Sequence, residues 1–402
     1  MLNPMSLKTV GWFVFSLCVL WVIMQVGLYM HVGFLDGGDS VRYYRAAEII
    51  FSGSWPGGKA ASYLGYNLFV TPFLALGLDR ITIGLSQVLL TALAALCLYK
   101  IGERVFSQRV GFTATLLYVA YPDIHYWNFI IYSESLYTSM MIVSLFLLLT
   151  RESRLQLAIA IGVMAFTCTI RPHGVGFALA IIAYFVYRLW EARKTTVLAV
   201  LALALALALP VAWVAVGKMA GYEMVGYYTD GTVVWHYDEL SLAVPSEVPV
   251  AVAKVDHPIA KILALAVASP NYFLQLVGAK LFYFFLHIRP YFSTGHNAIS
   301  LLFLVPAYTF ALWGLFRSPA RQSSDKVVLV AIVVFQTLIV SLTYADWDGR
   351  FLIPILPPVF LLAASGFWSM FDIGLSRLTG KATPPRPNSR MRCADGGNLK
   401  RR

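Results

Sequence analysis

The sequence has little charge and few cysteines. Only 13% of its 402 residues are charged, whereas 59% are hydrophobic, and the apolar residues come in repeated runs of helix-spanning length. This composition argues against a soluble protein and indicates a polytopic α-helical membrane protein. The four cysteines, Cys18, Cys97, Cys168 and Cys393, show no CxxC or Cys/His spacing. They therefore imply neither a disulfide framework nor a metal site.

Two further signals are missing from the chain. There are no segments of alternating apolar and polar residues of the kind that build outer-membrane barrels, and runs such as 197–216 are apolar on every side. A closed bundle of helices is then the only plausible spanning structure. The net charge of +11 does not indicate a nucleic-acid partner, because the Lys and Arg residues fall in short clusters between apolar runs. Such clusters are a topology signal.

We predict an all-α integral membrane bundle of about ten spans. The first run is too long for a signal-peptide core, and no small-residue cleavage site follows it, so we expect a retained helix. The predicted spans are residues 10–29, 81–99, 110–121, 135–149, 155–170, 174–190, 197–216, 298–316, 327–344 and 351–371. Two more apolar segments are expected not to cross: 66–78 is short and contains Pro72, and 259–287 is only half apolar.

The domain expected from this pattern is a membrane-embedded unit over residues 1–371. It has a first outer loop with juxtamembrane helices at 32–80 and a longer outer loop at 217–296. Residues 372–402 are rich in proline and basic side chains and are expected to be a disordered cytoplasmic tail. This assignment places about 20 of the 31 Lys and Arg residues inside the cell and about 14 of the 20 acidic residues outside.

The same topology brings several polar corners to the outer face of the cell membrane, with both termini in the cytoplasm. Carboxylates come from the first outer loop (Asp36, Asp39) and a later corner (Glu134), and cations come from Arg171, His173 and Arg350. Any one of them has an ordinary explanation as a solvated loop residue. Together they suit an anionic substrate, because cations hold a phosphate and a carboxylate accepts a proton or a sugar hydroxyl.

The order of these residues resembles a family of membrane glycosyltransferases. Asp39, Tyr43 and Ala47 at four-residue steps, followed by Ile50 and Gly53, resemble the first-loop signature of glycosyltransferases of the C-type fold (GT-C). This group includes protein O-mannosyltransferases, lipid A aminoarabinose transferases and bacterial lipopolysaccharide-core glycosyltransferases. Later landmarks agree in order: Pro122 with Ser133-Glu134, then Ile170-Arg171-Pro172-His173-Gly174, then Gly349 to Pro357.

The resemblance implies a GT-C architecture and a sugar donor linked to polyprenyl phosphate. By position it makes Asp39 the catalytic carboxylate and Glu134 a second active-site carboxylate. The sequence departs from the family pattern in two places that bear on substrate binding. Ser40 stands where many members have Glu, and no lysine between 63 and 67 is available for the lipid phosphate. Arg171, His173, Arg350 or Lys59 would then hold that phosphate.

The mechanism implied by the family is a single displacement with inversion. Because phosphate is a good leaving group, one carboxylate base and several cations suffice, unlike the acid and base pair of a glycosidase. We expect Asp39 to deprotonate the acceptor, with Arg42, Tyr43 and a supporting Asp36 binding substrate. Asp36, Asp39 and Glu134 could offer oxygen ligands to a divalent metal, but we expect no metal and no cofactor.

The expected activity is transfer of a hexosyl or pentosyl group to a hydroxyl of a lipid, glycan or protein. A transporter or flippase is an alternative, but the ionisable residues gather at one face and no inverted repeat is evident. An O-antigen ligase or polymerase is a nearer alternative. Such enzymes typically have an arginine-rich outer loop, whereas 217–296 has one arginine. A non-enzymatic scaffold would not need these converging charges.

Overall fold

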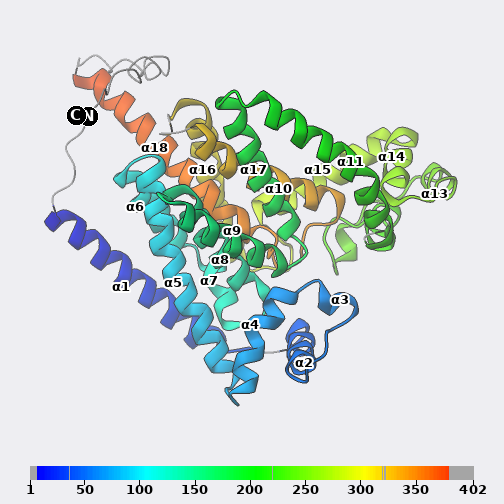
Figure 1. Cartoon of the computed structure of the whole chain (residues 1–402), viewed down its shortest axis with the longest axis horizontal. Helices are drawn as coiled ribbons and strands as arrows, with labels where there is room; N and C mark the ends of the chain where they lie inside the picture. Colours follow the sequence, from blue (N-terminus) through cyan, green and yellow to red (C-terminus); the bar gives the residue numbers. More distant parts are fainter. Residues whose placement is uncertain (1–6, 36, 220, 319, 321–322, 380–402) are drawn as a thin grey trace, which may run out of the picture.

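The computed structural model describes residues 7–35, 37–219, 221–318, 320 and 323–379. Asp36 and residues 380–402, with most of the predicted tail, lie outside the described residues. The regular structure of the described part is helical, with only isolated backbone bridges between extended residues. The predicted all-α membrane fold is confirmed, and Figure 1 shows the helices in order along the chain.

Seven helices of the described part are long and apolar enough to cross a bilayer. All seven were predicted from the sequence as spans. They are α1 (Leu7–Val32), α5 (Arg80–Val105), α8 (Ser133–Thr150), α10 (Gly174–Glu191), α16 (Thr294–Arg317), α17 (Ser323–Leu342) and α18 (Leu356–Thr379), the last preceded by a 3-10 turn at Ile353–Ile355. The last helix runs past the predicted domain boundary at residue 371.

Most other apolar segments are shorter or bent. The shorter helices are α4 (Leu64–Ala75), α6 (Gln108–Ala120) and α9 (Arg154–Thr169). Helix α11 (Thr195–Met219), by contrast, has 25 residues and contains Pro210. At about 1.5 Å per residue, a 13-residue helix such as α6 reaches only about 20 Å. The segment 259–287 forms α14 (Pro258–Ala268) and α15 (Pro270–Leu286), which meet at 115°. The predicted count of about ten spans is therefore not confirmed.

Small residues let the central helices approach closely. On α18, a Cβ added to Gly366 would lie 1.9 Å from the carbonyl oxygen of Phe310 on α16, and one added to Gly314 would meet the carbonyl of Leu362. Gly102 of α5 and Gly111 of α6 meet in the same way. Lipid offers no hydrophobic drive for helix association, so close packing of this kind holds the bundle together.

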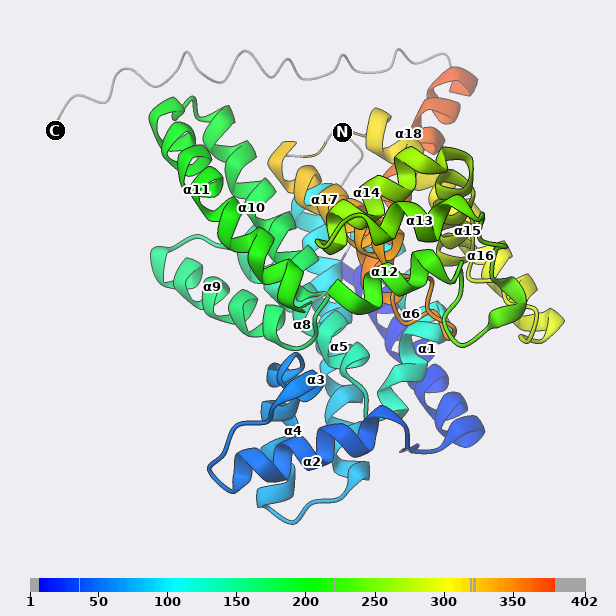
Figure 2. The same ribbon diagram turned by 90° about the vertical axis from the view of Figure 1, so that its right-hand side faces the viewer.

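The first loop, which follows α1, forms a cap of helices at one end of the molecule. Figures 1 and 2 show α2 (Asp39–Phe51), α3 (Gly58–Ala61) and α4 together, at the end opposite the C-terminal end of α18. Helix α2 is amphipathic: it buries Ser40, Tyr43, Ala46 and Ala47, which lie three or four residues apart, and packs against α4.

Backbone hydrogen bonds join several corners between the helices to one another. The N–H of Leu35 donates to the carbonyl of Phe129 at 2.8 Å, which joins the first loop to the corner before α8. The N–H of Ala345 donates to Val233 at 2.9 Å, which joins the corner before α18 to the long loop. That loop carries α12 (Gly221–Thr229), a 3-10 turn (Asp238–Leu240) and α13 (Glu247–Ala253). The corner before α8 carries α7 (Pro122–Tyr126) and a turn at Trp127–Phe129.

Candidate active site

Asp39 opens α2 and is placed there by the glycines before it. Gly38 has a left-handed φ of 52°, and a Cβ at this position would lie 2.6 Å from the hydroxyl of Tyr132. The N–H of Asp39 donates to that hydroxyl at 3.2 Å. A carboxylate in the first turn also faces the positive end of the helix dipole. The sequence Gly-Gly-Asp therefore fixes Asp39 against the corner that precedes α8.

The carboxylate of Asp39 joins two arginines. Its Oδ1 lies 3.0 Å from Nη1 of Arg42, one turn along α2, and its Oδ2 lies 3.2 Å from Nη1 of Arg350. The Asp39 side chain is 27% exposed, more than any other carboxylate of this network. It is thus the acidic group of the network that a substrate can reach most directly.

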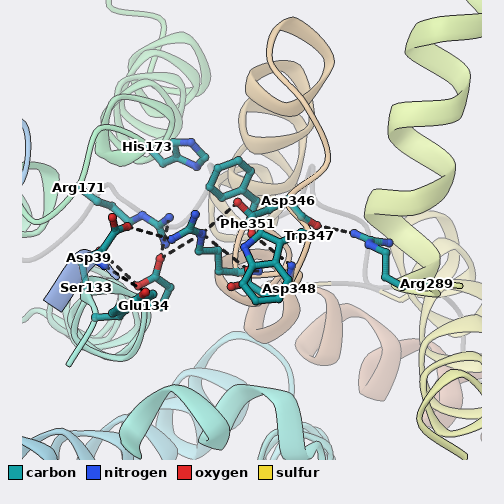
Figure 3. Close-up of polar contacts among 12 residues, drawn as sticks. Asp39, Ser133, Glu134, Arg171, His173, Arg289, Asp346, Trp347, Asp348 and Phe351 are labelled. Carbon is teal, nitrogen blue, oxygen red and sulfur yellow. Dashed lines mark hydrogen bonds and ion pairs between the residues drawn. The ribbon is translucent and has the colours of Figure 1, made fainter. Parts of the chain in front are cut away.

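Glu134 lies deeper, in the first turn of α8. Its Oε1 is 3.2 Å from Nη2 of Arg171, and both side chains are 2% exposed. Arg171 comes from the corner between α9 and α10, so this pair connects that corner to the start of α8 in a buried setting. Removing one partner of such a pair is costly, because the charge of the other partner is then buried without a counter-charge or water. Figure 3 shows Asp39, Glu134 and Arg171 turned toward one another.

Arg350 is the hub of the network. Its Nε lies 3.0 Å from Oδ2 of Asp346, 3.7 Å from Asp348 and 3.9 Å from Glu134. Burial opposes the charge on Arg350, but the carboxylates, Asp346 first, raise its pKa and keep it charged. One guanidinium thus holds carboxylates from the first loop, from the start of α8 and from its own corner at a common point.

Asp346 and Asp348 share this corner but differ in protonation. Burial would raise the pKa of Asp346, yet the charge of Arg350 and hydrogen bonds outweigh it and lower that pKa. Burial and the neighbouring Asp346 raise the pKa of Asp348 well above its ordinary value. We conclude that Asp346 is ionised and that Asp348 holds the proton. Arg289 supports the corner by donating from Nη2 to the carbonyl of Asp346 at 2.6 Å.

His173 lies beside the network, but as a neutral group. Burial, and then the charge of Arg171, lower the pKa of His173 well below 6.5. Its Nδ1 lies 2.9 Å from the amide nitrogen of Gln336, which donates to it, and its ring packs against Phe351 with centroids 4.1 Å apart. At physiological pH a neutral imidazole does not carry the positive charge that the sequence analysis expected of His173.

Two arginines keep unused donors in the described structure. Nε and Nη2 of Arg42, and Nε and Nη1 of Arg171, are buried without a hydrogen-bond partner among the described residues. Tyr63 lies beside the first of these arginines: its ring is 5.1 Å from the guanidinium carbon of Arg42. The pKa of Tyr63 is raised by burial, while the charge of Arg171 is the largest influence in the opposite direction. Unsatisfied guanidinium donors of this kind are suited to an anion.

The structure thus brings together most of the predicted site residues. Asp39, Glu134, Arg42, Arg171 and Arg350 form the network directly. Tyr43 is buried beside it, next to the Arg42 guanidinium. Lys59 is exposed on α3, and Asp36 lies outside the described residues.

Several residues of the network were missed as individuals by the sequence analysis. Asp346 and Asp348 belong to a corner that was predicted to reach the outer face, and their two-residue spacing before Arg350 is a signal that could have been used. Arg289 carries no such signal, because only the folded chain brings it to the site.

A second polar cluster is formed by residues of α7, of α16 and of the corner between α15 and α16. Oδ2 of Asp123, on α7, is 3.3 Å from Nε2 of both His287 and His296, and the three ligating atoms lie within 4.8 Å of one another. Burial would raise the pKa of Asp123, but hydrogen bonds from the two histidines outweigh it and lower that pKa. The sequence analysis did not single out these three residues as metal ligands.

Comparison with known proteins supports the fold. The family model of dolichyl-phosphate-mannose-protein mannosyltransferases matches residues 64–214. None of the curated proteins matches the chain by sequence. The archaeal oligosaccharyltransferase AglB from Archaeoglobus fulgidus, solved with an inhibitory peptide and a dolichol-phosphate, is similar over 95% of this chain and 53% of its own, with a TM-score of 0.50 and 15% identity.

The apo structure of ArnT from Cupriavidus metallidurans matches over 93% of this chain and 64% of its own, with a TM-score of 0.44 and 15% identity. The chain therefore spans about half the length of the AglB chain and less than two thirds of the ArnT chain. The resemblance to GT-C membrane glycosyltransferases predicted from the sequence is confirmed, and with it the predicted fold class.

Proposed function

We propose that this protein transfers a sugar from a polyprenyl-phosphate donor to a hydroxyl group at the outer face of the membrane. The observation that carries the proposal is the site itself: a reachable carboxylate, Asp39, next to arginines whose N–H donors have no partner in the described structure. A carboxylate base beside an anion-binding set is what single displacement from a sugar phosphate requires. The partial family match and the AglB-like fold support the donor class.

The phosphate of the donor is held, in this proposal, by Arg42 and Arg171. Each offers two buried donors, and phosphate oxygens accept such charge-assisted bonds readily. Arg350 serves another purpose, because four carboxylates surround it. It holds Asp39 in position and leaves the phosphate to the other two arginines.

The reaction follows from this placement. The acceptor oxygen attacks the anomeric carbon as the bond from that carbon to the phosphate oxygen breaks. The hydroxyl proton passes to Asp39, and the electron pair leaves with the phosphate, whose charge the two arginines stabilise. Attack from the face opposite the phosphate inverts the anomeric centre. Glu134, buried against Arg171, acts as a positioning residue for that guanidinium.

Substitution of Arg171 by lysine tests the phosphate assignment. Lysine keeps the charge but loses the planar fork of donors, so we expect the KM for a polyprenyl-phosphate sugar to rise about 10-fold or more, for a loss of at least about 1.4 kcal/mol. Arg154→Lys, at an exposed residue at the start of α9, is the matched control and is expected to leave KM unchanged. Equal KM values for the two variants would contradict the assignment.

A further inference from the structure

Among the described residues, the cluster of Asp123, His287 and His296 shares no ion pair with the network around Arg350. Asp123 lies in the first turn of α7, His287 follows the end of α15, and His296 lies in the first turn of α16. Two imidazoles and one carboxylate form a donor set that binds divalent transition metals, Zn²⁺ above all, with a position left open for water.

The distances fit that donor set. Zinc bonds of about 2.0–2.1 Å in a tetrahedron place neighbouring ligand atoms about 3.3 Å apart. Both histidine nitrogens lie 3.3 Å from the same oxygen of Asp123, a long separation for a charge-assisted hydrogen bond. The two nitrogens are at most 4.8 Å apart. The His296 side chain is 35% exposed, so His296 has more room than the buried His287 to adjust toward the tetrahedral separation.

The two rings are held in place by their surroundings. His287 adopts a left-handed backbone conformation with φ of 50°, which is uncommon for a residue with a side chain. Its ring fills the space beside Gly349, where an added Cβ would lie 1.8 Å from it. Phe292 stacks on the His296 ring with centroids 4.2 Å apart. A strained residue held by its neighbours is a reason to look for function.

We propose that Asp123, His287 and His296 bind one Zn²⁺ ion outside the glycosyl-transfer site. His287 is 2% exposed, whereas Asp123 and His296 are 22% and 35% exposed, so the open coordination position faces solvent. No described residue accepts a hydrogen bond from Nδ1 of His287. Since an acceptor there usually strengthens binding by about 10- to 100-fold, the ion binds with modest affinity.

The site has a structural consequence for the rest of the molecule. A bound ion joins α7 to the corner between α15 and α16. His287 in turn supports Gly349, which precedes Arg350 in the chain. The ion would therefore brace the corner that carries the hub of the charge network. This proposal rests on the cluster alone and does not require the proposed glycosyl transfer.

The test is zinc binding by the full chain purified in detergent and stripped with a chelator. We expect the wild-type protein to take up about one Zn²⁺ per chain in competition with a chromophoric chelator. Asp123→Asn and His296→Gln are each expected to bind at least about 10-fold more weakly. His31→Gln, at an exposed histidine at the end of α1, is the matched control and is expected to bind as the wild type does.

Cobalt supplies a second measurement that needs no folded Asp123 variant. Co²⁺ in the wild-type site should show the visible absorption of a four- or five-coordinate ion, and His296→Gln should lose it while eluting as a folded protein. The proposal is overturned if stripped wild-type protein takes up no Zn²⁺, because the cluster is then a hydrogen-bonded group only. It is equally overturned if both site variants bind as tightly as the control.

Discussion

Arg350 is the residue on which the candidate active site depends, because it connects carboxylates from the first loop, from α8 and from its own corner. Four carboxylates meet three arginines, Arg42, Arg171 and Arg350, in this site. An unbalanced negative charge in a largely buried site is costly, unless one of the carboxylates is neutral. Asp348 meets this need by holding its proton. The charge balance of the site is thus set by a side chain that need not touch the substrate.

Substitution of Asp348 by asparagine tests this charge balance through pH. Since the pKa of Asp348 in the folded protein lies well above its ordinary value of 3.8, the unfolded chain loses this proton first. Stability therefore falls as pH rises from about 4 toward the raised pKa. Asparagine resembles the protonated acid, so Asp348→Asn should flatten this part of the profile of melting temperature against pH.

Asp346→Asn is the matched variant for that measurement. It removes the ionised partner of the Arg350 Nε group and should lower the free energy of unfolding by about 3–5 kcal/mol. The assignment of the proton to Asp348 is contradicted if Asp348→Asn is the more destabilising of the two, or if its pH profile has the wild-type slope.

At the scale of elements, the sequence was most informative about helices. Runs such as 135–149 and 327–344 appear as α8 and α17 within a few residues, because apolar length alone identifies a span. The corner at Arg171 and Pro172 was also predicted, since proline and glycine interrupt helices. The 115° bend between α14 and α15 was not, because Ser269-Pro270 marks a break in the helix but not its angle.

The site was predictable only as a set of corners. Topology placed Asp39, Glu134, Arg171 and Arg350 on one face. The pairing of Glu134 with Arg171, and the role of Arg350 as a hub, depend on packing distances that no spacing in the sequence encodes. His173 was expected to be a cation, and its neutrality follows from burial that only the fold produces.

The close contact between helices α16 and α18 can be tested directly by mutation. In Gly366→Ala the new Cβ would lie 1.9 Å from a backbone carbonyl, so the helices must separate. We expect a loss of about 1–3 kcal/mol and a melting temperature in detergent lower by several degrees. Gly162→Ala on α9, where an added Cβ has no neighbour within 4 Å, should leave it unchanged or raise it slightly. Equal effects would contradict the packing described here.

At the scale of the whole molecule, the described spans hold a cap of short helices over one end. The candidate active site lies where that cap meets the corners that carry Glu134, Arg171 and Arg350 (Figures 1 and 3). Distant parts of the chain, 311 residues apart for Asp39 and Arg350, meet there. This arrangement would suit the proposed donor, whose lipid chain would stay in the membrane while its phosphate and sugar reach a polar site.

The most direct test is sugar transfer by membranes containing the wild-type protein or Asp39→Asn, incubated with a panel of labelled polyprenyl-phosphate sugars. The account predicts transfer of at least one label by the wild-type protein and a loss of about 10²–10⁴-fold in Asp39→Asn, the range expected when a catalytic base is removed. Equal expression and elution of the two proteins is the control. Full activity of a folded Asp39→Asn, or no transfer from any donor by the wild-type protein, would contradict it.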